Sequence, residues 1–106
     1  MQKKWSELHE KAEKLACDAE VIGRSGDSEA ARHLYRQAAA AETEAFHAIP
    51  SGLPRTLGVT AVSAVSLWEK AGNSVRATEV AKTAMAMDAL PASARRELEI
   101  PYGSRT

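Results

Sequence analysis

Residues 57–87 read LGVTAVSAVSLWEKAGNSVRATEVAKTAMAM. Apolar side chains recur every three or four residues on both sides of Gly72-Asn73-Ser74, which is the spacing of one helix face. Gly72 suits the left-handed residue that ends a helix, and Asn73 or Ser74 can accept the free N–H groups that begin the next helix. This stretch therefore predicts a helical hairpin with a tight turn, and Trp68 belongs to its buried stripe.

A second copy of the hairpin lies earlier in the chain. The segment Gly26-Asp27-Ser28-x-x-Ala31 matches Gly72-Asn73-Ser74-x-x-Ala77, which begins 46 residues later. The apolar positions on both sides of the two turns correspond as well: Leu15 with Ala61, Ile22 with Trp68, Ala31 with Ala77, Tyr35 with Ala81, and Ala38 with Ala84. Equal spacing around two equal turns indicates two copies of one unit.

This unit resembles the tetratricopeptide-repeat (TPR) family over roughly residues 15–91. That family has a large residue, a small residue and an aromatic along the first helix, Gly-Asp or Gly-Asn at the turn, and small residues with a second aromatic on the second helix. Asp18 and Ala81 depart from the pattern, because an apolar residue and an aromatic are usual there. The 46-residue offset exceeds the roughly 34 residues of a regular array, so elongated helices are expected. The chain is similar to short bacterial TPR-like proteins, and the resemblance implies a right-handed stack of helix pairs that acts as an interaction module.

We therefore expect one all-α domain over residues 1–106. It consists of two antiparallel helix hairpins and a short capping helix, at about residues 3–49, 54–89 and 91–100. The capping helix begins at Pro91, is stopped by Pro101, and covers the exposed end of the stack. Gly58 costs its helix about 1 kcal/mol relative to alanine, so we expect another backbone to pack closely against it.

The composition and charge of the chain limit the classes of function that it can have. The formal net charge is zero, with 14 basic and 14 acidic residues, which argues against nucleic-acid or anionic-membrane partners because both require an excess of Lys and Arg. The single cysteine, Cys17, excludes an internal disulfide and suits a reducing compartment. No run approaches the roughly 18 apolar residues of a membrane span, and glutamates interrupt any secretory signal after Lys3 and Lys4. A cytoplasmic protein is expected.

Three residues with metal-binding side chains follow one another at four-residue intervals: His9, Glu13 and Cys17. All three types can bind zinc, but one helix presents them in a line, whereas a tetrahedral site needs ligands that converge from elsewhere. His33 and His47 lie on another predicted helix with no cysteine nearby. We therefore predict no catalytic residue, no metal site and no cofactor, so that the protein is not an enzyme. A deep polar pocket holding several of these side chains would support the opposite hypothesis.

The candidate partner-binding residues lie on the third predicted helix: Arg55, Val59, Val62, Ser66 and Glu69. In TPR proteins the first helix of each unit lines the concave face, and the resemblance places the last four of these residues there, with Glu13, Ala16 and Glu20 from the first unit. Val59 and Val62 give the third helix a second apolar face. Arg55 lies in its first turn, where free N–H groups already favour an anion, although a solvated arginine is the commoner case.

The sequence thus predicts a non-catalytic module that binds a peptide or helix of a protein partner. The alternative is a structural homo-oligomer, such as a homodimer, in which the face of Val59 and Val62 meets its own copy. A glutamate at Val62 should abolish either contact if this face is free. The same substitution should unfold the chain if the face belongs to the core.

Overall fold

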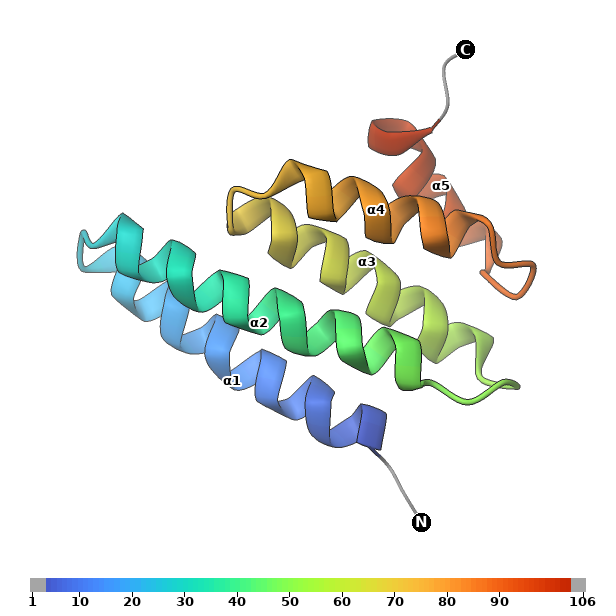
Figure 1. Cartoon of the computed structure of the whole chain (residues 1–106), viewed down its shortest axis with the longest axis horizontal. Coiled ribbons are helices and arrows are strands. Elements are labelled where there is room, and N and C mark those ends of the chain that lie inside the picture. Colours follow the sequence, from blue (N-terminus) through green and yellow to red (C-terminus); the bar gives the residue numbers. More distant parts are fainter. Residues whose placement is uncertain (1–3, 104–106) are drawn as a thin grey trace.

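The computed structural model describes residues 4–103, which form five helices and no strand (Figure 1). The helices are α1 (Lys4–Arg24), α2 (Ser28–Ala48), α3 (Pro54–Lys70), α4 (Ser74–Met85) and α5 (Ala92–Tyr102). Consecutive helices pack antiparallel to each other, and the last one is short. The predicted all-α fold of two hairpins and a short final helix is confirmed.

Both hairpin turns have the geometry that their repeated motif predicts. Gly26 and Gly72 have φ values of 104° and 78°, in the region that glycine adopts without the steric cost of a side chain. Asp27 and Asn73 follow them, and each side chain accepts a 3.0 Å hydrogen bond from the backbone N–H three residues later. The same motif therefore ends one helix and begins the next at both turns.

The long spacing between the two turns is explained by the helices between them. α2 contains 21 residues and α3 contains 17, so both are longer than a regular repeat would have. Pro54 is the first residue of α3, as the sequence predicts. None of the helices within residues 4–103 is long and apolar enough to cross a membrane.

The core is centred on α3, which packs against α2, α4 and α5. It consists largely of alanine, leucine and valine side chains. Trp68 is 4% exposed, and its indole N–H donates a 2.8 Å hydrogen bond to the hydroxyl of Thr43 on α2. Trp68 is therefore a core residue, as predicted, and it joins the second hairpin to the first.

The boundaries differ from the prediction in two places. α5 continues through Pro101 to Tyr102, so the prediction that Pro101 stops this helix is wrong. Pro101 lies in the last turn, where its missing N–H removes only one helical hydrogen bond, and the N–H of Gly103 still bonds to the carbonyl of Glu99. α4 ends at Met85, before the limit of the predicted second hairpin. Lys3, where the first hairpin was expected to begin, lies outside the described residues.

Candidate partner-binding groove

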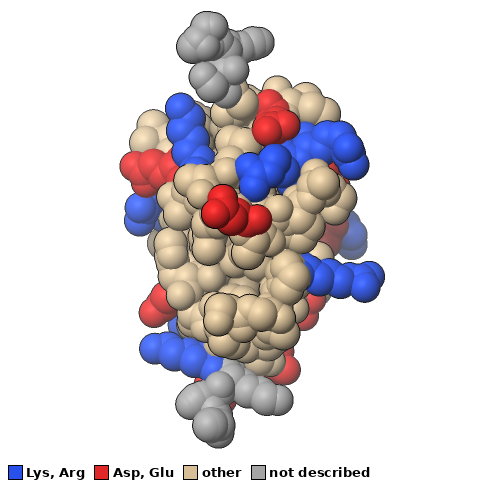
Figure 2. Space-filling view, turned by 90° about the vertical axis from the view of Figure 1, so that its right-hand side faces the viewer, with Lys and Arg blue, Asp and Glu red and all other residues tan. Residues whose placement is uncertain are grey.

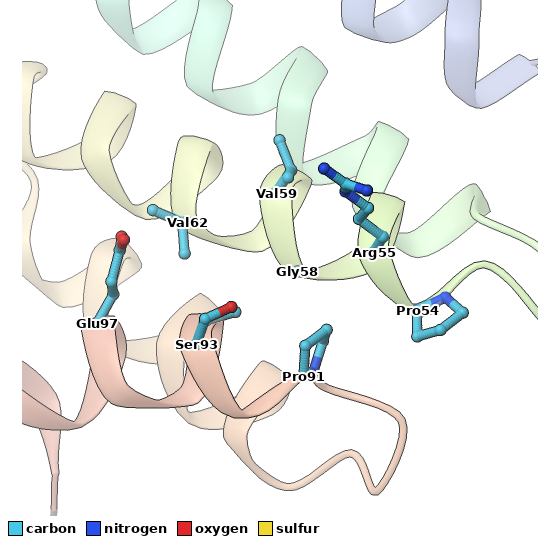
Figure 3. A pocket seen from close by; sticks show the side chains of 9 residues that line it. Pro54, Arg55, Gly58, Val59, Val62, Pro91, Ser93 and Glu97 are labelled. Atoms are coloured by element: carbon cyan, nitrogen blue, oxygen red, sulfur yellow. The ribbon is translucent and has the colours of Figure 1, made fainter.

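A groove of about 660 Å³ lies between α3 and the start of α5 (Figure 3). Its lining is mostly apolar and comprises Pro54, Arg55, Gly58, Val59, Val62, Pro91, Ser93, Ala94 and Glu97. The groove thus brings together Arg55, Val59 and Val62 from the predicted partner-binding set. Ser66 and Glu69, the other members of that set, do not line it.

α3 and the start of α5 approach each other closely at Gly58. A Cβ atom at this position would lie 3.0 Å from the Cβ of Ala94 and 3.1 Å from the Cδ of Pro91, tighter than ordinary van der Waals contact. Gly58 is closely packed, as predicted, but the nearest atoms belong to the side chains of Ala94 and Pro91 and not to another backbone. Without a side chain at Gly58, α5 can lie against α3 and form the second wall of the groove.

Val59 and Val62 both line the groove but differ in how far they are covered. Val59 is 61% exposed, whereas Val62 is half-buried and packs against the hydrophobic core. A glutamate at Val62 would therefore disturb the core as well as the groove surface. Val59 is the better position at which to test the groove by substitution.

The two charged residues of the groove lie at opposite ends. Figure 3 shows Arg55 next to Pro54 at the end where α3 and α5 begin, and Glu97 across from Val62 at the other end. The N-caps of α3 and α5 are Leu53 and Pro91, and neither forms a side-chain cap hydrogen bond. The positive ends of two helix dipoles therefore lie at the same end as Arg55, whose side chain extends towards Val59 in Figure 3.

Glu69 holds the far end of α5 against α3 and is not a free side chain. The Tyr102 hydroxyl donates a hydrogen bond to its carboxylate. Burial, this hydrogen bond and the negative charge of Glu69 together raise the pKa of Tyr102 to about 12. Ser66 is half-buried on the same helix. These two predicted binding residues therefore lie beyond the groove, and Glu69 has a structural partner.

One smaller hollow adjoins the groove, and another lies between α1 and the end of α3. One, of about 250 Å³, is lined by Trp5, His9, Arg55, Thr56, Val59 and Thr60. The other, of about 380 Å³, is lined by Glu13, Ala16, Cys17, Glu20, Tyr35 and Lys70. Arg55 and Val59 line both the first hollow and the groove, so the concave surface continues from α5 across α3 to α1. The three α1 residues that the TPR resemblance assigns to the concave face line the second hollow.

The end of the molecule at which α3 and α5 begin has a broad uncharged area (Figure 2). Charged side chains lie mainly around its margins and over its upper part. Leu53 and Met87, on the two loops at this end, are exposed apolar residues. Because Leu53 directly precedes Pro54, apolar surface continues from the groove onto this end of the molecule.

A buried carboxylate that the sequence did not predict lies at the contact between α1 and α2. Glu42 is fully buried, and both of its carboxylate oxygens lie 3.0 Å from Nδ1 of His9. The other ring nitrogen of His9, Nε2, lies 3.5 Å from Oε2 of Glu13. A signal was available, because Glu42 is spaced four residues from Ala38 on the buried stripe of α2, and a buried carboxylate requires a partner.

The side chains considered for metal binding do not converge on one site. His9 contacts Glu13, whereas Cys17 is exposed on the same helix. His33 and His47 are exposed on α2. Within residues 4–103, no group of three or more His, Cys, Asp or Glu side chains has the geometry to hold a metal ion.

Over residues 4–103 the structure thus shows five helices, with an apolar groove between α3 and α5 that continues towards α1. No protein-family model, no curated protein and no solved structure matches the chain.

Proposed function

We propose that the protein is a non-catalytic, TPR-like adaptor that binds a peptide or helix of a protein partner in the groove between α3 and α5. The observation that carries this proposal is the groove itself, about 660 Å³ with apolar walls and one charged residue towards each end. Concave apolar surfaces with a few placed polar groups are the usual form of a binding site, and helical proteins often receive a partner's helix in such a groove.

The order of the helices supports the TPR-like part of the proposal. The two hairpins share one turn motif, and α3 lies between α2 and α4 (Figure 1). In a TPR stack the first helix of each pair faces the concave side, which corresponds here to α1 and α3, with α5 as the capping helix. The groove and both hollows are lined by residues of these three helices, with Tyr35 of α2 at one edge.

A peptide-display experiment with matched substitutions tests the proposal. Peptides selected from a random library on the wild-type protein should bind Val59→Glu at least about tenfold more weakly, since a charge would then be buried in the apolar groove. Val75→Glu is the control, because Val75 is 67% exposed on α4 and lines neither the groove nor either hollow. Its peptide affinity should equal that of the wild type.

Two outcomes would contradict the proposed function. Failure to select any peptide would remove its support, and peptides that tolerate Val59→Glu would place the binding surface elsewhere. Light scattering on the purified protein tests the alternative, which is self-association. A dimer that Val59→Glu separates into monomers would identify a second copy, and not a different protein, as the partner in the groove.

A further inference from the structure

We infer that the occupant of the groove is an amphipathic helix that runs antiparallel to α3 and α5, with an acidic residue near its C-terminus against Arg55 and a basic residue near its N-terminus against Glu97. This inference rests on the proposed function and adds the chemistry and direction of the partner segment. Three features support it: the helical walls, the positions of the two charged residues, and the shared direction of α3 and α5.

The walls of the groove favour a helix over an extended peptide. Both walls are helical, so their backbone N–H and C=O groups are bonded within the helices except at the ends. An extended peptide buried between them would leave its own backbone groups without partners, and each such group carries a desolvation cost. A helix satisfies its backbone internally and presents only side chains to Val59, Val62 and Ala94.

The size of the groove sets the length of this helix. From Arg55 to Val62 the groove follows about 10 Å of α3 at 1.5 Å per residue. About two helical turns of the partner therefore span the distance between the two charged residues. Apolar side chains at positions i, i+3 or i+4, and i+7 would face the valines and Ala94.

The charges set the direction of the partner helix. α3 and α5 begin at the end marked by Arg55, and neither has a side-chain cap, so Arg55 and two positive dipole ends lie at this end. The C-terminus of a partner helix carries the opposite partial charge, and an acidic side chain there would pair with Arg55. At the other end, Glu97 would pair with a basic residue in the partner's first turn.

This charge order distinguishes recognition by the groove from the intrinsic stability of the peptide helix. A free helix prefers acidic residues in its first turn and basic residues in its last turn. The groove favours the reverse order. Enrichment of the reverse order in a binding selection therefore reports the groove and not the stability of the unbound peptide.

The test is a display library of helical peptides of about four turns. The apolar positions are kept, and two positions about two turns apart, one towards each terminus, vary among Glu, Lys and Gln. Selection on the wild-type protein should enrich Glu near the C-terminus together with Lys near the N-terminus. The opposite charge order should bind roughly three- to tenfold more weakly, as expected for rim charge pairs.

Two charge reversals check which side chain recognises which end. Arg55→Glu should change the preference near the peptide C-terminus from Glu to Lys, and Glu97→Lys should change the preference near the N-terminus. Arg55→Glu should fold normally, because an acidic residue suits the first turn of a helix. Arg36→Glu is the control, since Arg36 is exposed on α2 and lines neither the groove nor either hollow.

The outcomes separate this inference from the function on which it rests. Peptides that bind with no charge preference, or with the opposite one, overturn the inference and leave a groove-binding module. A preference that Arg55→Glu fails to change overturns it as well. If no peptide binds at all, the proposed function itself fails.

Discussion

At the scale of single residues, the contact between His9 and Glu42 is expected to have the greatest effect on the free energy of unfolding. Glu42 is fully buried, and its hydrogen-bond partner among the described residues is His9. A buried carboxylate that loses its partner keeps the cost of leaving water without the compensating bond. The imidazole therefore secures α1 to α2 at a point where the neighbouring buried contacts of α1 are alanines.

His9→Ala is expected to lower the free energy of unfolding by about 2–3 kcal/mol, measured by urea denaturation, because Glu42 is left buried and unpaired. His33→Ala, an exposed histidine on α2, is the control and should stay within about 0.5 kcal/mol of the wild type. Replacing both partners with leucine should recover much of the loss. A double variant as unstable as His9→Ala would show that the loss comes from packing and not from the unpaired carboxylate.

Tyr102 gives a pH dependence whose sign follows from its raised pKa. Its folded pKa is about 12 against an ordinary value of 10.0, because burial and the bonded, negatively charged Glu69 disfavour the phenolate. The neutral phenol therefore contributes stability below pH 10, and this contribution is lost as the pH rises from 10 to about 12. Tyrosinate absorbance in a Tyr35→Phe variant should show Tyr102 titrating later in the folded chain than in urea. Identical midpoints would contradict the contact with Glu69.

At the scale of secondary-structure elements, the stability of α5 depends on its packing against α3 and α4. It has 11 residues, and an isolated helix of this length is only marginally stable in water. Ala94 and Leu98 are buried in the core, and Arg95 donates hydrogen bonds of 2.6 and 3.0 Å to the carbonyls of Met85 and Met87. These bonds satisfy backbone groups at the end of α4, which α4 itself cannot do.

Gly58→Leu is expected to displace α5 from α3, because the space for a side chain at this position is taken by Ala94 and Pro91. The overpacking should cost about 1–3 kcal/mol. Hydrogen exchange should show faster exchange in α5 while α1 and α2 stay protected. Val59→Leu, at the adjacent exposed position, should leave α5 unchanged. Unchanged α5 exchange in Gly58→Leu would show that the helix is held elsewhere.

At the scale of the whole molecule, the two hairpins are joined by one hydrophobic core. The buried cluster is contiguous from α2 through α5. The hydrogen bond from Trp68 to Thr43 crosses between the hairpins, and the contact from His9 to Glu42 attaches α1 to α2. A chain connected in this way should unfold as one unit.

The two tryptophans allow this expectation to be measured, since Trp5 lies on α1 and Trp68 on α3. Fluorescence in Trp5→Phe and in Trp68→Phe should each follow the same urea transition as the circular dichroism of that variant. Trp68→Phe should be less stable by about 1 kcal/mol, because the hydrogen bond to Thr43 is lost. Separate fluorescence and dichroism transitions would show that the hairpins unfold independently.

The sequence by itself determined the number, type and order of the elements. The repeated Gly-Asp/Asn turns and the helical spacing of apolar residues act over a few neighbouring positions, so they can be read without knowing which helices meet. The buried role of Trp68 and the close packing at Gly58 also follow from the sequence. The effect of Pro101 does not follow from the sequence, since it depends on whether the residue lies inside a helix or in its last turn.

Only the tertiary structure decided which of these residues form the groove. Val59 and Val62 have the same residue type and lie on the same helix, but packing leaves one exposed and covers much of the other. The contacts from His9 to Glu42 and from Tyr102 to Glu69 each join residues 33 positions apart. No local pattern specifies such pairs, because they arise from the way whole helices align. For the same physical reason, the groove exists only once α5 has packed against α3.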